Sequence, residues 1–345
     1  DTPADLFEDA NAYIFVIFMG IPVVFLYNLL AAIIRALGDS RTPVYFLALS
    51  AGLNIVLDLA CILLLNWGVA GAAIATVVSQ AVSGVACLVY MVKKFPILQI
   101  TREERRLNAD ACKALCAMGL PMGLQYSITA IGSIVMQTAV NGLGSVYVTA
   151  VATAGKVYQL LACPFDAMGA AMATYCGQNV GAGELDRLPQ GVRACSLLGL
   201  GYSAAALLAM IFFAPQCAML FLSSADPQLG LLVGLTTQYI VIQTAFFFPL
   251  ALVNILRFSI QGMGFSAFAI LAGVLEMIAR TVVGYFFVPG MGYTAACFAS
   301  PAAWICADLF LIPACLGCVA HLRRSNPTAS LETLSRRMLK KTAKA

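Results

Sequence analysis

The stretch KKFPILQITREERRLNADACK, residues 93–113, is the long charged segment in the interior of this 345-residue chain. On both sides of it the chain is strongly apolar, because hydrophobic residues make up 61% of the sequence and charged residues only 10%. Soluble domains carry about 25% charged residues. The composition therefore indicates a protein that lies mostly in a lipid bilayer, and the charged segment divides it into a shorter first part and a longer second part.

Nine apolar runs are each about long enough, at ~20 residues, to cross a bilayer core as a helix. In hydrocarbon every backbone amide must find its hydrogen-bond partner inside the protein, and a helix provides one. The short alternating segments that are typical of a membrane β-barrel are not found in the sequence. We therefore predict an all-α polytopic membrane protein with helices over residues 13–35, 43–66, 69–92, 114–142, 146–175, 191–222, 228–260, 267–288 and 292–320.

The distribution of Lys and Arg predicts the orientation of these helices. If residues 93–113 are cytoplasmic, the loops on the opposite side contain no Lys or Arg; these loops are 1–12, 66–68, 143–145, 223–227 and 289–291. Basic residues favour the cytoplasmic side of a membrane. We expect a multi-pass protein of the cell inner (plasma) membrane with a cytoplasmic C-terminus. The net charge of +4 follows from the same bias, so it does not indicate nucleic-acid binding.

Cysteine and histidine give no sign of a metal site or a disulfide framework. The chain has twelve Cys but one His, and its CxxC pair, Cys315 and Cys318, lies within an apolar run. Zinc sites need closely spaced N or S ligands, whereas a buried Cys commonly acts as a small apolar residue. We expect no metal and no cofactor.

A long-range repeat links two parts of the chain. The stretch YIFVIFMGIPVVFLYNLLAAIIRALGDS from Tyr13 is similar to YIVIQTAFFFPLALVNILRFSIQGMGFS from Tyr239. Further on, LSAGLNIVLD from Leu49 matches LAGVLEMIAR, and Gly68 then matches Gly290. A repeat of this length in a membrane protein indicates two similar lobes, which is a common plan for secondary transporters.

The repeat predicts four parts of the chain. These are a partial N-terminal lobe of three helices (1–92), a cytoplasmic interlobe linker (93–113), a C-terminal lobe of six helices (114–320) and a basic cytoplasmic tail (321–345). The three helices of the first lobe match the last three of the second. The second lobe begins after Lys113, and the repeat offset of 226 residues would place the start of the first lobe about 113 residues upstream of residue 1. A protein with nine helices is the alternative.

Five motifs resemble those of the multidrug and toxic compound extrusion (MATE) transporters. They are RALGDSRTP (35–43), LNIVLD (53–58), GVAGAAIAT (68–76), GLPMGLQYSI (119–128) and GQNVGAG (177–183). Each motif alone is a weak signal, but five in the right order and at the right spacing are specific. The resemblance covers essentially the whole chain and runs from the family's fourth helix to its twelfth.

The resemblance implies a MATE-type two-lobe helical bundle, with nine of twelve transmembrane helices present and a substrate cavity between the lobes. It implies a secondary active antiporter that exports cationic or amphipathic drugs in exchange for H⁺ or Na⁺ by alternating access. The implied partners are small organic cations, amphipathic drugs and the bilayer, and the implied state is a monomer. Bends at helix prolines would let the lobes alternate; these prolines are Pro22, Pro121, Pro164, Pro249 and Pro301.

Lys156 and Asp166 are the first candidate site residues, because ionisable groups at membrane depth are costly and need a reason. They share the predicted helix 146–175, which resembles the family's cavity-lining eighth helix. Asp166 would exchange a proton against a cationic drug, and Lys156 would hold it ionised until then. A structural Lys–Asp pair is the alternative.

Gln125, Thr129 and Gln137 on the helix that begins near Pro121 are further candidates. Gln137 resembles the uncharged counterpart of a proton-binding aspartate on the family's first helix, which lies outside this sequence. Other branches of the family carry a carboxylate where Thr129 stands here. Coupling through the second lobe in their style is therefore not expected.

The other intramembrane polar groups have cavity or structural interpretations. The remaining drug-cavity candidates are Asn28, Gln243 and Asn254. Glu276 and Arg280 are four residues apart, so they face the same way on a helix and predict a self-neutralising pair. Asp58 is the repeat partner of Arg280 and is interpreted as part of a structural or interlobe ion pair, with a role in transport as the alternative. Asp308 is left to pair with Arg257 or Arg280.

Two other functions stay open on the sequence. A lipid-linked oligosaccharide flippase of the same superfamily would need several basic residues in its cavity, whereas only Lys156, Arg257 and Arg280 lie within the spans. A non-transporting membrane fragment or interaction partner is the second alternative. An enzyme is not expected, because the sequence has no nucleophile–base constellation and no metal motif.

Overall fold

The computed structural model describes residues 7–98, 108–222 and 227–325. The structure is 91% helix, with no strand within those ranges, which confirms the predicted all-α class. Residues 99–107 of the predicted linker and residues 326–345 of the predicted basic tail lie outside the described residues. The chain divides into two compact units, Asp1–Leu107 and Asn108–Ala345.

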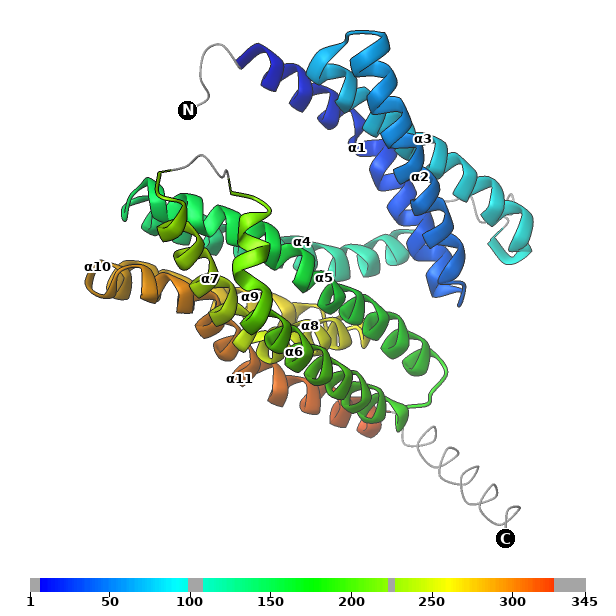
Figure 1. The fold of residues 1–345 in the computed structure, drawn as a ribbon. Helices are drawn as coiled ribbons and strands as arrows, with labels where there is room; N and C mark the ends of the chain where they lie inside the picture. The colour runs from blue at the N-terminus through cyan, green and yellow to red at the C-terminus, as the bar shows by residue number, and fades with distance from the viewer. Residues whose placement is uncertain (1–6, 99–107, 223–226, 326–345) are drawn as a thin grey trace. The chain divides into compact units, whose positions relative to one another are not determined.

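The first unit is a group of three helices, coloured blue to cyan in Figure 1. They are α1 (Phe7–Ala36), α2 (Arg41–Leu59), which continues as a π-helix over Ala60–Leu64, and α3 (Gly68–Lys94). α3 packs along both α1 and α2 and so holds the group together. Its small core joins α1 to α3 and consists of Tyr27, Leu30, Ala31, Ile34 and Cys87.

The second unit contains the remaining helices (Figure 1). They are α4 (Ala109–Asn141), α5 (Ser145–Gly181), α6 (Arg187–Met219), α7 (Leu229–Ala245), α8 (Phe247–Gly262), α9 (Ala267–Val282), a π-helix (Val283–Phe287), α10 (Val288–Met291) and α11 (Tyr293–Ser325).

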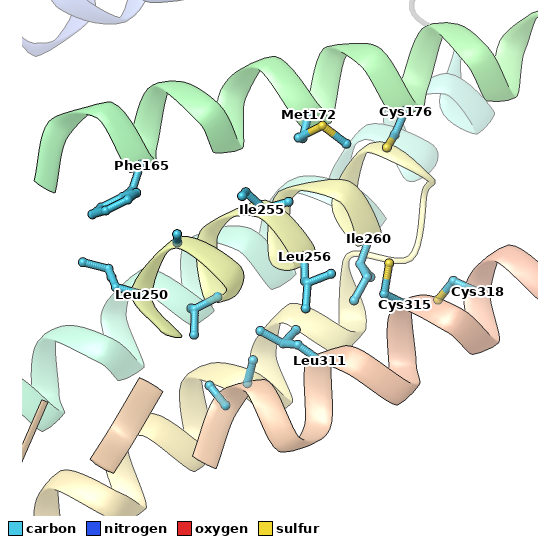
Figure 2. Packing of buried hydrophobic residues seen from close by; sticks show 14 of the residues in the cluster. Phe165, Met172, Cys176, Leu250, Ile255, Leu256, Ile260, Leu311, Cys315 and Cys318 are labelled. Carbon is cyan, nitrogen blue, oxygen red and sulfur yellow. The ribbon is translucent and has the colours of Figure 1, made fainter. Parts of the chain in front are cut away.

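The largest core of the second unit surrounds α8. Figure 2 shows Ile255 and Ile260 of α8 between Phe165 of α5 and Leu311 of α11, and all four side chains are fully buried. α6 also packs against α8. Because protein covers α8 on several sides, its polar residues are buried with its apolar ones.

Eight described helices, counting π-helical extensions, are long and apolar enough to cross a membrane, and α7 with α8 gives a ninth span bent by 50°. The predicted count of nine is met when the bent pair is one span, but the single helix predicted over 228–260 is wrong. The break falls at Phe246, because Pro249 has no N–H for the carbonyl of Ala245 and its ring would clash with that carbonyl. Pro249 instead occupies the first turn of α8, where an N–H has no helical partner.

The other four prolines with predicted bends lie inside helices that continue through them: Pro22, Pro121, Pro164 and Pro301. A proline in a helix leaves the carbonyl four residues earlier without its donor. At Pro301 this carbonyl belongs to Cys297, and the side-chain nitrogen of Gln243 donates to it at 2.9 Å. Both residues are buried. The side-chain nitrogen of Gln243 therefore replaces the backbone donor that Pro301 removes from α11.

The first prediction concerns this repair. We expect Gln243→Leu to lower the stability of the detergent-solubilised protein by about 1 kcal/mol, the scale of side-chain hydrogen bonds between membrane helices. On a Pro301→Ala background the same substitution should cost less, because the introduced alanine would donate its own backbone N–H to the carbonyl. Thermal unfolding of the four proteins in this double-mutant cycle measures the difference, and an equal loss on both backgrounds would contradict the assignment.

The internal repeat is visible in the backbone. Gly38 and Gly264 follow the equivalent helices α1 and α8, and they have φ values of 93° and 94°. Glycine is the usual residue for such left-handed helix ends. Gly68 has φ 55°, and the corresponding value of 63° occurs at Gly292. Gly290, the match expected from sequence, lies inside α10 instead.

The two π-helices also occupy corresponding places. Ala60–Leu64 extends α2, the second helix of the first set, and Val283–Phe287 extends α9, its counterpart in the second. In the first set α3 packs against α1 and α2, and in the second set α11 packs against α8 and α9. The two copies of the repeat thus share the position of a π-helix as well as the order of their helices.

Asp39 fixes the turn between α1 and α2. Its carboxylate accepts hydrogen bonds from the Thr42 amide at 3.1 Å, the Thr42 hydroxyl at 2.7 Å and the Tyr90 hydroxyl at 2.8 Å, and Lys94 lies 3.8 Å away. These bonds, with those from Thr42 the strongest, lower the pKa of Asp39 from 3.8 to about 2. The motif at residues 35–43 therefore has a structural role, because its Asp39 accepts hydrogen bonds from Thr42 in the first turn of α2.

The second prediction uses this shift. A depressed pKa stabilises the fold above the unfolded value near 3.8, and that stabilisation is lost as the pH falls towards about 2. At neutral pH we expect Asp39→Asn to lower the melting temperature by roughly 2–4 °C, as for loss of a helix cap. The gap between variant and parent should narrow between pH 4 and 2 in thermal unfolding. A gap that stays constant over this range would rule out the ionised carboxylate as the cause.

Candidate functional site: a cavity beside a buried ion group

Helices α4 and α9 approach closely because glycine occupies contact positions between them. A Cβ on Gly273 would lie 3.2 Å from Gln125 Cγ, and one on Gly284, in the π-helix that extends α9, would lie 3.2 Å from Met136 Sδ. Small residues allow such close packing in membranes. The candidate residue Thr129 lies in the same contact and donates its hydroxyl to the Gln125 carbonyl at 3.0 Å. Gln125 is 1% exposed, so both candidates lie where two helices pack.

A buried ion group joins α8 to α9. Glu276 accepts a hydrogen bond from Arg280 Nη2 at 3.3 Å, which confirms the predicted pair, and it also pairs with Arg257 Nη2. All three residues are buried, with exposed fractions between 3% and 8%. One carboxylate therefore pairs with two guanidinium groups, and Arg257 Nε and Arg280 Nη1 have no hydrogen-bond partner within the described part of the chain.

Asp308 of α11 is the fourth buried charged residue of the second unit, at 6% exposed. Its Oδ1 has no hydrogen-bond partner among the residues that the structure describes. The ion pair between Asp308 and Arg257 or Arg280 that the sequence suggested is not formed in the described ranges, where both arginines pair with Glu276. Glu276 is the better partner because it lies one turn from Arg280 on the same helix face.

Arg280 also lines a cavity of about 180 Å³ within the second unit. Its polar wall contains Ser133, Gln137, Tyr239, Arg280 and Ser300, and its apolar wall contains Met136, Val140, Val151, Ala296 and Ala299. The cavity borders the surface of the unit, since Ser133 and Gln137 are exposed. It is thus a small amphipathic space with a cationic side chain in its wall.

Helical spacing explains why these residues meet. The four residues from α4 recur at intervals of three and four, so they share one helix face. The residues from α11 are Ala296, Ala299 and Ser300, whose small side chains leave room that a larger residue would fill. Tyr239 of α7 and Val151 of α5 complete the wall.

Of the eight residues predicted for the site, Gln137 is the one that lines this cavity. Its side-chain nitrogen donates to Asn141 Oδ1 at 2.9 Å, one turn along α4. Asn254 is buried in α8, and its side-chain nitrogen bonds the carbonyl of Leu250 in its own helix. Asn28 belongs to the first unit, where it is exposed and donates to the carbonyl of Val24.

The predicted pairing of Lys156 with Asp166 is wrong. Both side chains are exposed on α5, and the helix is continuous between them. Ten residues of helix separate them by about 15 Å along the axis, which is too far for an ion pair. The Lys156 ammonium instead lies over the ring of Phe221, 5.5 Å from its centroid. Pro164 lies between them, and α5 continues through it.

Sequence reasoning missed most of the cavity. Ser133, Tyr239 and Ser300 come from three helices, and serine and tyrosine are common enough that none stands out in the sequence. Arg280 was identified as an intramembrane charge but was interpreted only as half of a pair. The usable signal was Ser133 four residues before Gln137, which places two polar side chains on one face of an apolar helix.

Comparison with known proteins identifies the family. The sequence model of the MatE family matches residues 1–60 and 121–286, which is more than half of the chain. The chain belongs to the MatE family. This membership confirms the resemblance carried by the five motifs, and the family is one of multidrug transporters and not of enzymes.

Two relatives from Bacillus subtilis (strain 168) cover much of this MATE chain. The probable multidrug resistance protein YpnP is 30% identical over 286 residues, which are 82% of this chain and 62% of YpnP. The probable multidrug resistance protein YoeA is 28% identical over 232 residues, which are 65% of this chain and 50% of YoeA. The chain thus matches between half and two thirds of the length of these relatives.

The fold agrees with solved MATE structures. The outward-facing conformation of a multidrug resistance MATE family transporter of the MOP superfamily aligns with a TM-score of 0.84 at 21% identity. The alignment covers 91% of this chain and 70% of that one. The helical architecture described above is therefore that of the family.

The third prediction tests the buried ion group. We expect Glu276→Gln to destabilise the protein by about 3–5 kcal/mol, because it leaves two buried guanidinium groups without their partner. Asp308→Asn is the matched control, since it removes a buried carboxylate that forms no ion pair in the described residues. Thermal unfolding in detergent should show the smaller loss for Asp308→Asn. Equal losses would mean that Glu276 does not hold the two arginines.

Proposed function

We propose that the protein exports cationic or amphipathic organic compounds across the cell membrane in exchange for protons or sodium. The observation that carries the proposal is membership of the MatE family together with the multidrug resistance names of its relatives YpnP and YoeA. The described helices are long and apolar enough for a membrane-spanning transporter. Alternating access between two lobes is the mechanism that the family resemblance implies.

The distribution of basic residues supports an orientation with the C-terminus in the cytoplasm of the cell, since Lys and Arg favour that side. In this orientation an inward ion gradient contributes ~2.3 kcal/mol per charge for every 100 mV. This free energy is enough to bias an exchange cycle by more than tenfold. A small cationic drug would leave as the coupling ion enters, and the membrane potential drives the cycle when more positive charge enters than leaves; a one-for-one exchange is driven by the concentration gradient of the ion.

Asp166 is the coupling candidate that we retain among the described residues. It is an exposed carboxylate within the long helix α5, and it forms no ion pair in the part of the chain that the structure describes. Intramembrane carboxylates commonly serve proton or ion pathways. Because Lys156 lies over Phe221 instead, Asp166 is left available to bind a proton or a cation.

The fourth prediction is that expression lowers accumulation of ethidium in a bacterial strain that lacks its own drug exporters. A protonophore should restore accumulation if protons drive the exchange, and removal of sodium should do so if sodium does. Fluorescence of intracellular ethidium gives the measurement. Unchanged accumulation, with the protein present in the membrane fraction, would refute export of this class of cation.

The same assay tests Asp166. We expect Asp166→Asn to reduce efflux strongly, because the neutral amide can neither bind a proton nor attract a cation. Asp110→Asn is the matched control, because it makes the same change at an exposed position in the first turn of α4. Equal efflux by the two variants would make Asp166 a structural residue.

A further inference from the structure

Arg280 has a hydrogen-bonding capacity that the fold does not use. Its side chain is buried, and its Nη2 binds Glu276. Its Nη1 has no partner among the described residues, although it is buried. A buried donor without an acceptor costs free energy, and more so when it is charged. Arg280 lines the cavity of about 180 Å³, so an acceptor placed there would remove this cost.

The cavity offers further donors beside this guanidinium group. Its wall contains the hydroxyl groups of Tyr239 and Ser300 and the amide of Gln137, which keeps one N–H beside its bond to Asn141, and each of these can donate a hydrogen bond. The Ser133 hydroxyl also lies in the wall, but it donates to the Thr129 carbonyl at 3.2 Å. Among the described residues, those that form the wall include no acidic side chain. Its polar side is therefore suited to an acceptor-rich anionic group.

The charge around the cavity favours an anion as well. Glu276 is shared by Arg257 and Arg280, so these three side chains together carry a net charge of +1. The carboxylates of Asp166 and Asp308 interact electrostatically with Arg257, and neither lines the cavity beside Arg280. Asp308 is not part of the cavity wall and forms no ion pair with either arginine in the described ranges. In surroundings of low dielectric constant such a charge attracts an anion more strongly than it would in water.

We propose that this cavity binds the carboxylate group of a small organic acid, with Arg280 as its charged partner. The carboxylate would accept hydrogen bonds from Arg280 Nη1 and from the hydroxyl groups nearby. The apolar body of the acid would contact Met136, Val140 and Val151. The inference concerns the substrate class of the proposed transporter and rests on that function only for its physiological role, because binding itself needs no transport.

The volume limits the size of this acid. A protein cavity of about 150 Å³ holds benzene, so about 180 Å³ suits a group of benzoate size. The ligand is either a free aromatic or aliphatic acid or the carboxylate end of a larger amphipathic compound. Guanidinium binds carboxylate with favourable planar geometry, which a carboxamide or an amidinium cannot reproduce.

The experiment measures binding of three probes of the same shape to purified protein in lipid nanodiscs at neutral pH. Benzoate is the anion, benzamide the neutral isostere and benzamidine the cation. Equilibrium dialysis of radiolabelled probes should give saturable binding of benzoate and at least about tenfold weaker binding of the other two, the effect of losing one charge-assisted hydrogen bond. Competition by 4-hexylbenzoate distinguishes a site for small free acids from a site for the carboxylate end of a larger amphipathic compound, because only the second admits the alkyl tail.

Variants then locate the site. Arg280→Gln should weaken benzoate binding about tenfold or more, and Ser300→Leu should abolish it by filling the cavity without touching the ion group. Lys156→Gln is the control, because it removes one positive charge from α5 outside the cavity wall and should leave binding unchanged. Thermal unfolding of each variant shows whether it is folded. If Arg280→Gln does not fold, the result for Ser300→Leu decides whether benzoate binds in this cavity.

Three results would overturn the inference. They are non-saturable uptake of benzoate, benzamidine binding as tightly as benzoate, and unchanged benzoate binding by folded Ser300→Leu. Ethidium efflux in cells is a separate readout. Efflux without benzoate binding would reject the carboxylate site alone, whereas benzoate binding without ethidium efflux would reject the export of cations and keep the site.

Discussion

The absence of water from the bilayer core is the constraint on which this structure depends. A backbone carbonyl or a charged side chain there must find its partner within the protein. Helices meet this requirement for nearly all backbone groups, and side chains meet it at the exceptions. Gln243 supplies the donor that Pro301 removes from the carbonyl of Cys297, and Glu276 is the shared ion-pair partner of two arginines.

The same constraint explains where polar function can be placed. Glycines let α4 and α9 pack closely, so Gln125 and Thr129 are enclosed between helices. A few residues further along α4, small residues of α11 leave space, and Ser133 and Gln137 face a cavity instead. Polar side chains on one helix therefore serve packing at one level of the unit and line an open space at another.

The sequence was sufficient for properties that depend on local pattern. Hydropathy predicted the spans, motif order predicted the family, and the spacing of Glu276 and Arg280 predicted their pair. It was insufficient where distant helices meet, because neither Arg257 beside Glu276 nor Gln243 beside Cys297 has a local signature. Lys156 and Asp166 show the reverse error, since two residues ten positions apart on one continuous helix are close in the chain but not in space.

The π-helices that extend α2 and α9 carry information about the history of the molecule. π-Helical turns are rare and appear mostly as single turns within α-helices. Two of them at corresponding places are more simply inherited together than acquired twice. The irregular turn is therefore a feature of the repeating unit itself, and it is kept although the residues that form it, ACILL and VGYFF, differ between the two copies.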